Sequence, residues 1–144
     1  MSVSNDGTCW ENLAAPSLDD FERLAKRAYA GLPEQFRALC GDVVIVIQDF
    51  ATDDAIASVN VTDPFELMGL YQGISLDRKG SQDIVEQPDM VFLYRRAILD
   101  YWAECGNETL ADLVTHVLVH EIGHHFGLSD DDMERLEAAA TTAV

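Results

Sequence analysis

The sequence has few basic residues. Its 144 residues include 9 lysines and arginines against 26 aspartates and glutamates, which gives a formal net charge of −17. A charge of this sign repels nucleic-acid phosphates and anionic membrane surfaces, so neither is expected as a partner. It favours basic peptides and metal ions as partners, and it is equally typical of a surface whose charge only keeps a protein soluble.

Long apolar runs and cysteine motifs are also lacking. The longest apolar runs, Val43 to Ile47 and Val117 to Val119, fall far short of the roughly 20 residues that a membrane helix needs. The three cysteines are an odd number without Cys-x-x-Cys spacing, and no cationic start followed by an apolar run precedes them. We therefore expect a cytoplasmic protein that does not enter a membrane.

Composition and length predict a single globular domain. The sequence is 48% hydrophobic and 24% charged, without internal repeats or low-complexity tracts. A chain of this size can bury about 68–70% of its unfolded surface, so a metal site would serve chemistry and not stability. We expect a monomer with a loose leader at 1–16, a domain at 17–137 and a flexible tail at 138–144.

Residue patterns predict helices and strands along this domain. Ser17 with Asp20 is typical of a capped helix that ends at Gly31, and Pro33 can open a second helix through Leu39. Strands are predicted at 43–47, 67–75 and 90–94, a helical connection from 97 toward 105, a loop or short helix at 51–63 and a charged surface loop at 77–88.

Two strands receive specific places in the predicted sheet. The β-branched run Val43 to Ile47 predicts a strand buried on both faces and central in a small sheet. Met90 to Tyr94 leads toward the last helices, and we expect it to be an exposed edge that can pair with an extended substrate. Gly69 and Gly73 in the remaining strand indicate a bulge or a close approach by another backbone.

Leu110 to Phe126 is predicted to form one helix. Thr109 with Asp112 is typical of a capping box, and Gly127 is typical of a helix stop. At 3.6 residues per turn, one stripe of this helix is apolar and the opposite stripe carries imidazoles. The apolar stripe comprises Val114, Leu118, Ile122 and Phe126, and the imidazole stripe comprises His116, His120 and His124.

The same helix contains the pattern HExxH, formed by His120, Glu121 and His124. Two histidines one turn apart can bind one Zn²⁺ from the same face, each with a nitrogen about 2.0–2.1 Å from the ion. Glu121 projects beside them and can act as a general base toward a water molecule. The pattern predicts a catalytic zinc site with two ligands from this helix.

A zinc site of this kind needs a third protein ligand soon after the helix ends. Asp130 lies three residues past Gly127 and completes the pattern HExxHxxGxxD, so we predict that it is this ligand. Asp131, Asp132 and Glu134 compete for the role, because the sequence from Ser129 is also typical of the capped, acidic first turn of a last helix.

The other two histidines are predicted to lie outside the set of ligands. His116 could pair with His120, but Val117 would then occupy the place of the glutamate. About 12 Å of helix separates His116 from His124, so these two cannot share one ion. His125 points about 100° away from His124 and is expected to pack or to form hydrogen bonds elsewhere.

The segments LMGLYQGIS, PDMVFLYRRAIL and VLVHEIGHHFGLSDDDMERL, in this order, resemble the bacterial minimal zincin-like metallopeptidase family. The resemblance runs from about Ser17 to Leu136. It implies a compact α+β fold with a small mixed sheet, His120, His124 and Asp130 as zinc ligands and Glu121 as general base. The pattern is also similar to that of metzincin proteases, but it lacks their separate downstream Met-turn because Met133 follows Asp130 almost at once.

The function predicted from these features is peptide-bond hydrolysis with zinc as the cofactor and a peptide or protein, possibly basic, as the substrate. Tyr94 and Arg95 at the end of the third strand are candidate substrate contacts, and they are also typical of ordinary residues at a strand end. An alternative is a non-catalytic acidic module that keeps a metal site and holds a basic protein partner.

Overall fold

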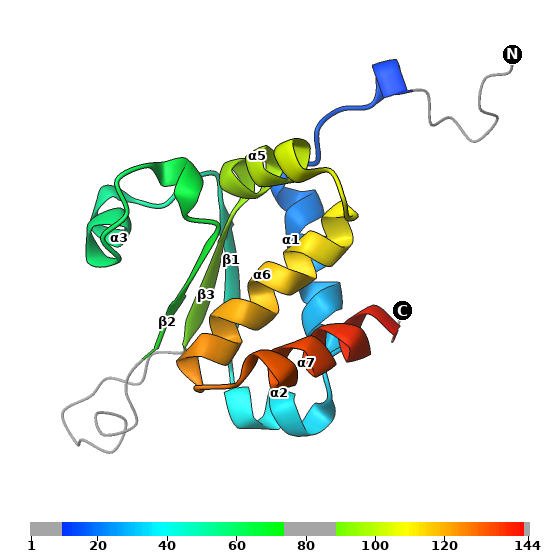
Figure 1. Ribbon diagram of the computed structural model, residues 1–144, viewed down its shortest axis with the longest axis vertical. Coiled ribbons are helices and arrows are strands. Elements are labelled where there is room, and N and C mark those ends of the chain that lie inside the picture. The colour runs from blue at the N-terminus through cyan, green and yellow to red at the C-terminus, as the bar shows by residue number, and fades with distance from the viewer. Residues whose placement is uncertain (1–9, 74–88, 143–144) are drawn as a thin grey trace, which may run out of the picture.

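The computed structural model describes residues 10–73 and 89–142, and these residues form an α+β fold around a three-stranded mixed sheet (Figure 1). The strands are β1 (Val44–Gln48), β2 (Gly69–Gln72) and β3 (Met90–Tyr94), in the order β1-β3-β2. β3 runs parallel to β1 and antiparallel to β2. The predicted fold class is therefore confirmed.

The predicted places of two strands are wrong. β3 lies in the middle of the sheet and pairs with both neighbours, whereas β1, among the strands that the structure describes, pairs only with β3 and forms an edge. β1 is also not buried on both faces, since its first residue is exposed and the others are half-buried. The central strand is the one whose Val91, Leu93 and Tyr94 are almost fully buried.

The first two helices follow the predicted boundaries. Helix α1 (Leu18–Ala30) begins with a capping box, in which the Ser17 hydroxyl accepts from the Asp20 N–H and the Asp20 carboxylate accepts from the Ser17 N–H. Helix α2 (Glu34–Cys40) follows Pro33 and ends at Gly41, whose φ of 69° suits glycine. Phe21 and Ala25 of α1 are fully buried in the main hydrophobic core.

Shorter elements connect the sheet to the helices. They are the single 3-10 turns η1 (Trp10–Asn12) and η2 (Pro64–Glu66), and helices α3 (Asp53–Ser58) and α5 (Arg95–Cys105). A second, smaller core joins Ala51 and Ala55 to Tyr94 and Ala97 where β3 leads into α5. The charged loop predicted at 77–88 lies outside the described residues.

Helices α1 and α6 (Leu110–His125) cover one side of the sheet, and α7 (Asp130–Thr142) packs on the outside of these two helices (Figure 1). Helix α6 packs against α1, β2 and β3, and helix α7 packs against α6 and α1. The backbone of Ala140 lies against Gly31, and a Cβ added at Gly31 would be 2.8 Å from the Ala140 carbonyl oxygen. Helix α7 thus extends into 138–144, the segment that the sequence analysis treats as a flexible tail.

No helix in the described part of the chain is long and apolar enough to span a bilayer.

Candidate metal centre

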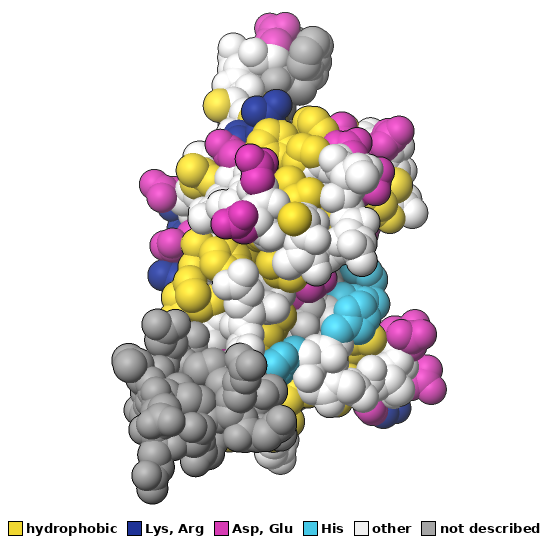
Figure 2. All heavy atoms as spheres, turned by 90° about the vertical axis from the view of Figure 1, so that its left-hand side faces the viewer, with side chains coloured by type: hydrophobic (Ala, Val, Ile, Leu, Met, Phe, Trp, Pro, Cys, Tyr) yellow, Lys and Arg dark blue, Asp and Glu magenta, His cyan; other side chains and the backbone are white. Residues whose placement is uncertain are grey.

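Helix α6 has the two opposite sides that its sequence predicts. Val114, Leu118 and Ile122 are fully buried in the main core. On the other side, His116 and His120 are half-buried and His124 is exposed. Figure 2 shows the histidine side chains at the surface in one larger and one smaller patch, with an acidic side chain beside the larger patch. The helix therefore anchors a row of imidazoles on a rigid, buried support.

The two histidines of the HExxH motif lie next to each other. The ring centroids of His120 and His124 are 5.7 Å apart, and their planes are nearly perpendicular. A tetrahedral zinc ion with two imidazole nitrogens at about 2.0–2.1 Å places the ring centres roughly 5 Å apart. The observed spacing is thus close to what a shared ion requires.

A glycine turn directs the chain from α6 into α7. Gly127 has a φ of 70°, its N–H donates to the His124 carbonyl, and the Leu128 N–H donates to the Gly123 carbonyl. This pair of hydrogen bonds is a Schellman motif, which stops a helix and reverses the chain. The predicted stop at Gly127 is confirmed, and the turn returns acidic residues to the neighbourhood of the histidines.

Asp130 is the first residue of α7 and is exposed. The Ser129 hydroxyl accepts from the Asp132 N–H, so the capped acidic helix start that competed with the ligand assignment is present. Within the described ranges, no hydrogen bond or ion pair joins Asp130 to a histidine, although its charge acts on the pKa of His120. Its role as third ligand stays a prediction.

The alternative ligands also lie in α7. Asp131 and Glu134 are exposed, and Asp132 is half-buried and forms an ion pair with Arg135. Among the residues that the structure describes, none of these three acids forms a hydrogen bond or ion pair with a histidine.

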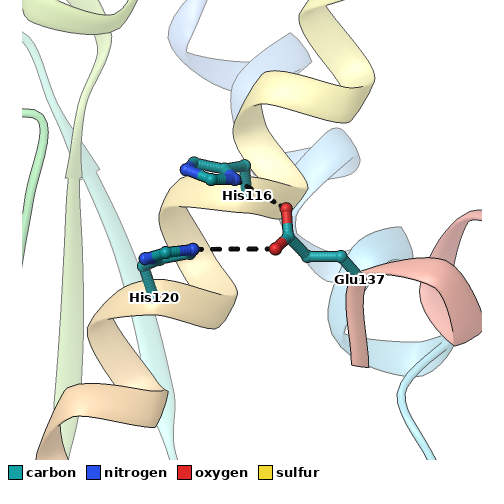
Figure 3. Close-up of side chains that lie close together, drawn as sticks. All are labelled: His116, His120 and Glu137. Carbon is teal, nitrogen blue, oxygen red and sulfur yellow. Dashed lines mark hydrogen bonds and ion pairs between the residues drawn. The ribbon is translucent and has the colours of Figure 1, made fainter. Parts of the chain in front are cut away.

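Among the described acids of α7, Glu137 has the carboxylate that lies closest to the histidine row. One of its oxygens is 2.7 Å from His116 Nδ1, and the other is 3.6 Å from His120 Nε2. Figure 3 shows the carboxylate reaching from α7 toward both rings of α6. One ligand atom from each of these residues lies within 4.8 Å of the other two. We call His116, His120 and Glu137 the upstream cluster, and His120, His124 and Asp130 the motif site.

Glu137 is not among the ligands predicted from the sequence, although the sequence contains a signal for it. Asp130, Met133 and Glu137 follow one another at helical spacing and therefore share a face of α7. Met133 is 1% exposed, which shows that this face is turned toward α6. A buried methionine flanked by two acids at this spacing would have indicated that both acids approach the histidines.

The electrostatics of His120 reflect its place between these acids. Burial lowers the pKa of His120, and the neighbouring His116 and His124 lower it further, whereas the charges of Glu137 and Asp130 act in the opposite direction. The net effect lowers the pKa and favours the neutral imidazole. A neutral imidazole is the form that binds a metal ion.

Glu121 lies on the sheet side of the motif. Burial raises the pKa of its carboxyl, while the nearby His124 and a hydrogen bond from the Tyr71 backbone N–H favour the charged form. A Cβ added at Gly69 would be 3.0 Å from Glu121 Cγ. The same Cβ would be 3.1 Å from the Phe92 carbonyl oxygen, so the backbone approach predicted for Gly69 is present. The approach of β2 to the side chain of the candidate base was not predicted.

The two candidate substrate contacts are engaged within the fold. Tyr94 is 1% exposed, and burial together with the charge of Glu121 raises its pKa to about 12. Arg95 Nε donates to the Pro16 carbonyl at 2.6 Å, and its guanidinium pairs with Asp49 at 3.0 Å. Contact of either residue with substrate stays a prediction.

His125 packs away from the other histidines, in agreement with the sequence analysis. Its ring stacks on Tyr71 with centroids 4.0 Å apart, and the Tyr71 hydroxyl donates to Asp89 at 2.7 Å. The ring stacking joins the C-terminal end of α6 to β2, and the hydrogen bond to Asp89 holds the Tyr71 ring in place.

The donors on this face suit a zinc ion. Imidazole nitrogens and carboxylate oxygens are among the ligands that zinc binds in proteins, and catalytic sites commonly combine three protein ligands with an open position. His120 and His124 supply two adjacent imidazoles, and acids of α7 lie near them. The neutral state of His120 and the adjacent Glu121 complete a set of groups suited to metal-assisted hydrolysis.

Comparison with known proteins agrees with this chemistry. The family model described as zincin-like metallopeptidase matches residues 40–140, which include the sheet, α6 and almost all of α7. A search of curated protein sequences found no match. On the strength of the family match, the chain belongs to the zincin-like metallopeptidase family.

Proposed function

We propose that this protein is a zinc-dependent peptidase whose ion is held by His120, His124 and Asp130. The observation that supports this proposal most directly is the 5.7 Å spacing of the two motif rings, with Glu121 on the same turn of the helix. When bound, zinc would act as a Lewis acid on the scissile carbonyl and lower the pKa of a water molecule.

In this proposal, Glu121 moves the protons of the reaction. Its carboxylate takes a proton from the attacking water and gives it to the leaving amine. Burial raises the pKa of Glu121, which brings a carboxylate closer to the neutral range where a general base is most effective. The Tyr71 N–H and Gly69 hold β2 against Glu121, so the strand would help to fix the position of the base.

The proposed substrates are peptides or unstructured protein segments, with basic ones favoured by the net charge of −17. We further propose that the protein acts as a cytoplasmic monomer.

The proposal is tested with zinc-loaded protein and a mixture of unstructured acidic and basic peptides, followed by mass spectrometry. We expect cleavage that a chelator stops and zinc restores. Glu121→Gln should lower kcat/KM by about 10²–10⁴-fold without loss of zinc, because only the base is removed. Glu104→Gln, at an exposed site in α5, is the matched control.

Two outcomes would contradict the proposal. An unchanged rate in Glu121→Gln would remove Glu121 from the mechanism. Basic peptides that bind and stay intact for hours, with zinc bound to the protein, would favour the non-catalytic binding module instead.

A further inference from the structure

The upstream cluster joins His120 of the HExxH motif to two metal donors outside the motif, His116 and Glu137. His116 and His120 lie one turn apart on α6, with ring centroids 4.0 Å apart. Glu137 faces both rings from α7 (Figure 3). The side chains are between 22% and 45% exposed, so an ion could reach them from solvent while the helices behind them stay packed.

The spacing of these donors is close to that of a zinc site. Ligands about 2.0–2.1 Å from a tetrahedral zinc ion are roughly 3.4 Å from one another. The distances from the Glu137 oxygens to His116 Nδ1 and His120 Nε2 are 2.7 and 3.6 Å. These two values lie on either side of the required distance, and all three donor atoms lie within 4.8 Å of one another, so modest side-chain rotations would bring them around one ion.

The position of Glu137 is fixed by the packing of α7 on α6. A Cβ at Gly123 would be 2.5 Å from the Met133 sulfur, so only a residue without a side chain allows this approach. Glu137 follows Met133 by one helical turn, and His120 precedes Gly123 by about one turn. The two helices therefore bring Glu137 to the histidines as a consequence of backbone packing.

We propose that His116, His120 and Glu137 form a second position for a zinc-type ion, distinct from the motif site. Its chemistry differs from that of the motif site because Val117, and not a carboxylate, follows its first histidine. Val117 is 4% exposed and belongs to the core. Val117 supplies no carboxylate at the place that Glu121 holds in the motif, so we expect this position to bind metal without hydrolysing a peptide bond.

The two positions compete because both use His120. A neutral imidazole has one nitrogen with a free lone pair, since the other nitrogen carries the proton. His120 therefore binds one ion at a time. Zinc binding at the upstream cluster does not depend on the proposed peptidase function. The inference that such binding inhibits peptide hydrolysis rests on that function.

The binding is tested by zinc titration of the full chain against a colorimetric chelator. His124→Ala removes a ligand of the motif site and leaves the upstream cluster intact, so we expect it to keep one zinc ion. Adding Glu137→Gln, or separately His116→Ala, should weaken that remaining binding by about tenfold or more. His125→Ala is the matched control for His124→Ala, because His125 stacks on Tyr71.

The proposal is overturned if His124→Ala binds no zinc, or if neither added substitution weakens its binding. His116 is half-exposed, so His116→Ala gives an answer even if the Glu137 variant were to unfold. Loss of all zinc binding in His120→Ala would support a histidine shared by both positions. Full binding in His120→Ala would contradict it.

The competition is tested by peptide hydrolysis with less than one zinc ion per chain. Glu137→Gln should raise the rate by up to about twofold if the two positions are equally populated, because more of the zinc then occupies the motif site. An unchanged rate would contradict the competition. Absence of hydrolysis in the parent protein would contradict the peptidase proposal, while the zinc titration would still decide the second position.

Discussion

The sulfur of Met133 lies against Gly123, at a distance that leaves no room for a Cβ on the glycine. This contact joins α7 to the turn of α6 that lies inside the HExxH motif. It places Asp130 and Glu137, which share a face of α7 with Met133, on the side of the histidines. A packing contact between two apolar groups thus decides which acids approach the candidate metal centre.

We expect Gly123→Ala to destabilise the protein. A methyl group at this position would overlap Met133, and such overpacking typically costs about 1–3 kcal/mol of unfolding free energy. At an uncrowded position in an exposed helix, Gly→Ala would raise the unfolding free energy by about 0.5–1 kcal/mol. The sign of the change therefore shows whether Met133 crowds Gly123. Urea unfolding of the metal-free protein measures it.

The double variant Gly123→Ala/Met133→Ala provides the control. Removing the methionine side chain makes room for the new methyl group, so the cost of Gly123→Ala should be smaller in the Met133→Ala background. If Gly123→Ala lowers the unfolding free energy equally in both backgrounds, overlap with the Met133 side chain is not the cause of the destabilisation.

Removal of the metal should stop hydrolysis and leave the fold in place. The main core contains fully buried residues from α1, β3 and α6, and none of them is a candidate ligand. Chelation should therefore leave the far-UV circular dichroism unchanged and lower stability only by the loss of binding, about 2.7 kcal/mol at 100 times Kd. Loss of helical signal on chelation would instead indicate a structural metal.

The local features of this site could be predicted from the sequence. The caps of α1 and α6, the stop at Gly127 and the opposite stripes of α6 depend on residues within a few turns of one another. The close approach at Gly69 could also be predicted, because glycine in a strand is typical of such contacts. What approaches Gly69, the side chain of Glu121, could not be predicted.

The errors concern relationships between distant segments. Both β1 and β3 are short apolar runs, and nothing in either run states which one pairs on two sides. Glu137 was missed for a similar reason, because its approach to His116 depends on how α7 crosses α6. That crossing is set by the contact of Met133 with Gly123, which are ten positions apart in the chain.

Arg95 offers a test that separates a structural role from substrate binding. Its guanidinium contacts the Pro16 carbonyl and the Asp49 carboxylate, and its side chain is 18% exposed. We expect Arg95→Ala to lower the unfolding free energy by about 1–3 kcal/mol, the range for lost hydrogen bonds of a charged group. It should also increase proteolytic cleavage near Pro16.

The neighbouring Arg96→Ala is the control, since Arg96 is exposed and lies over the Phe50 ring at 5.5 Å. Arg96→Ala should lower the unfolding free energy by about 1 kcal/mol or less. A raised KM in Arg95→Ala with unchanged stability would support the substrate contact predicted from the sequence.

Cys40 should react slowly with alkylating reagents. Burial raises the pKa of its thiol to about 11, so only about one molecule in a thousand carries the reactive thiolate at pH 8. Cys105 is exposed and should be labelled before Cys40. Peptide mapping after brief treatment with iodoacetamide measures both sites, and labelling of Cys40 at the rate of Cys105 in folded protein would contradict the prediction.

Gly69→Ala tests whether β2 positions the candidate base. A methyl group at Gly69 would be 3.0 Å from Glu121 Cγ and 3.0 Å from Val117 Cγ1, so either the strand or the glutamate must move. Displacement of a catalytic group by about 1 Å can cost up to about 10²-fold in rate, and the shift of a few tenths of an ångström that this contact requires should cost less. We therefore expect kcat to fall while zinc binding, which depends on the histidines and acids, is retained.

The double variant Gly69→Ala/Val117→Ala separates steric crowding from other effects. Replacing Val117 removes one of the two side chains that the new methyl group would meet, and kcat should recover in part if Glu121 can return to its position. Val117→Ala alone supplies the baseline for the cavity that this substitution leaves in the core. Normal kcat in Gly69→Ala would show that Glu121 tolerates displacement of β2, and the strand would then have no part in positioning the base.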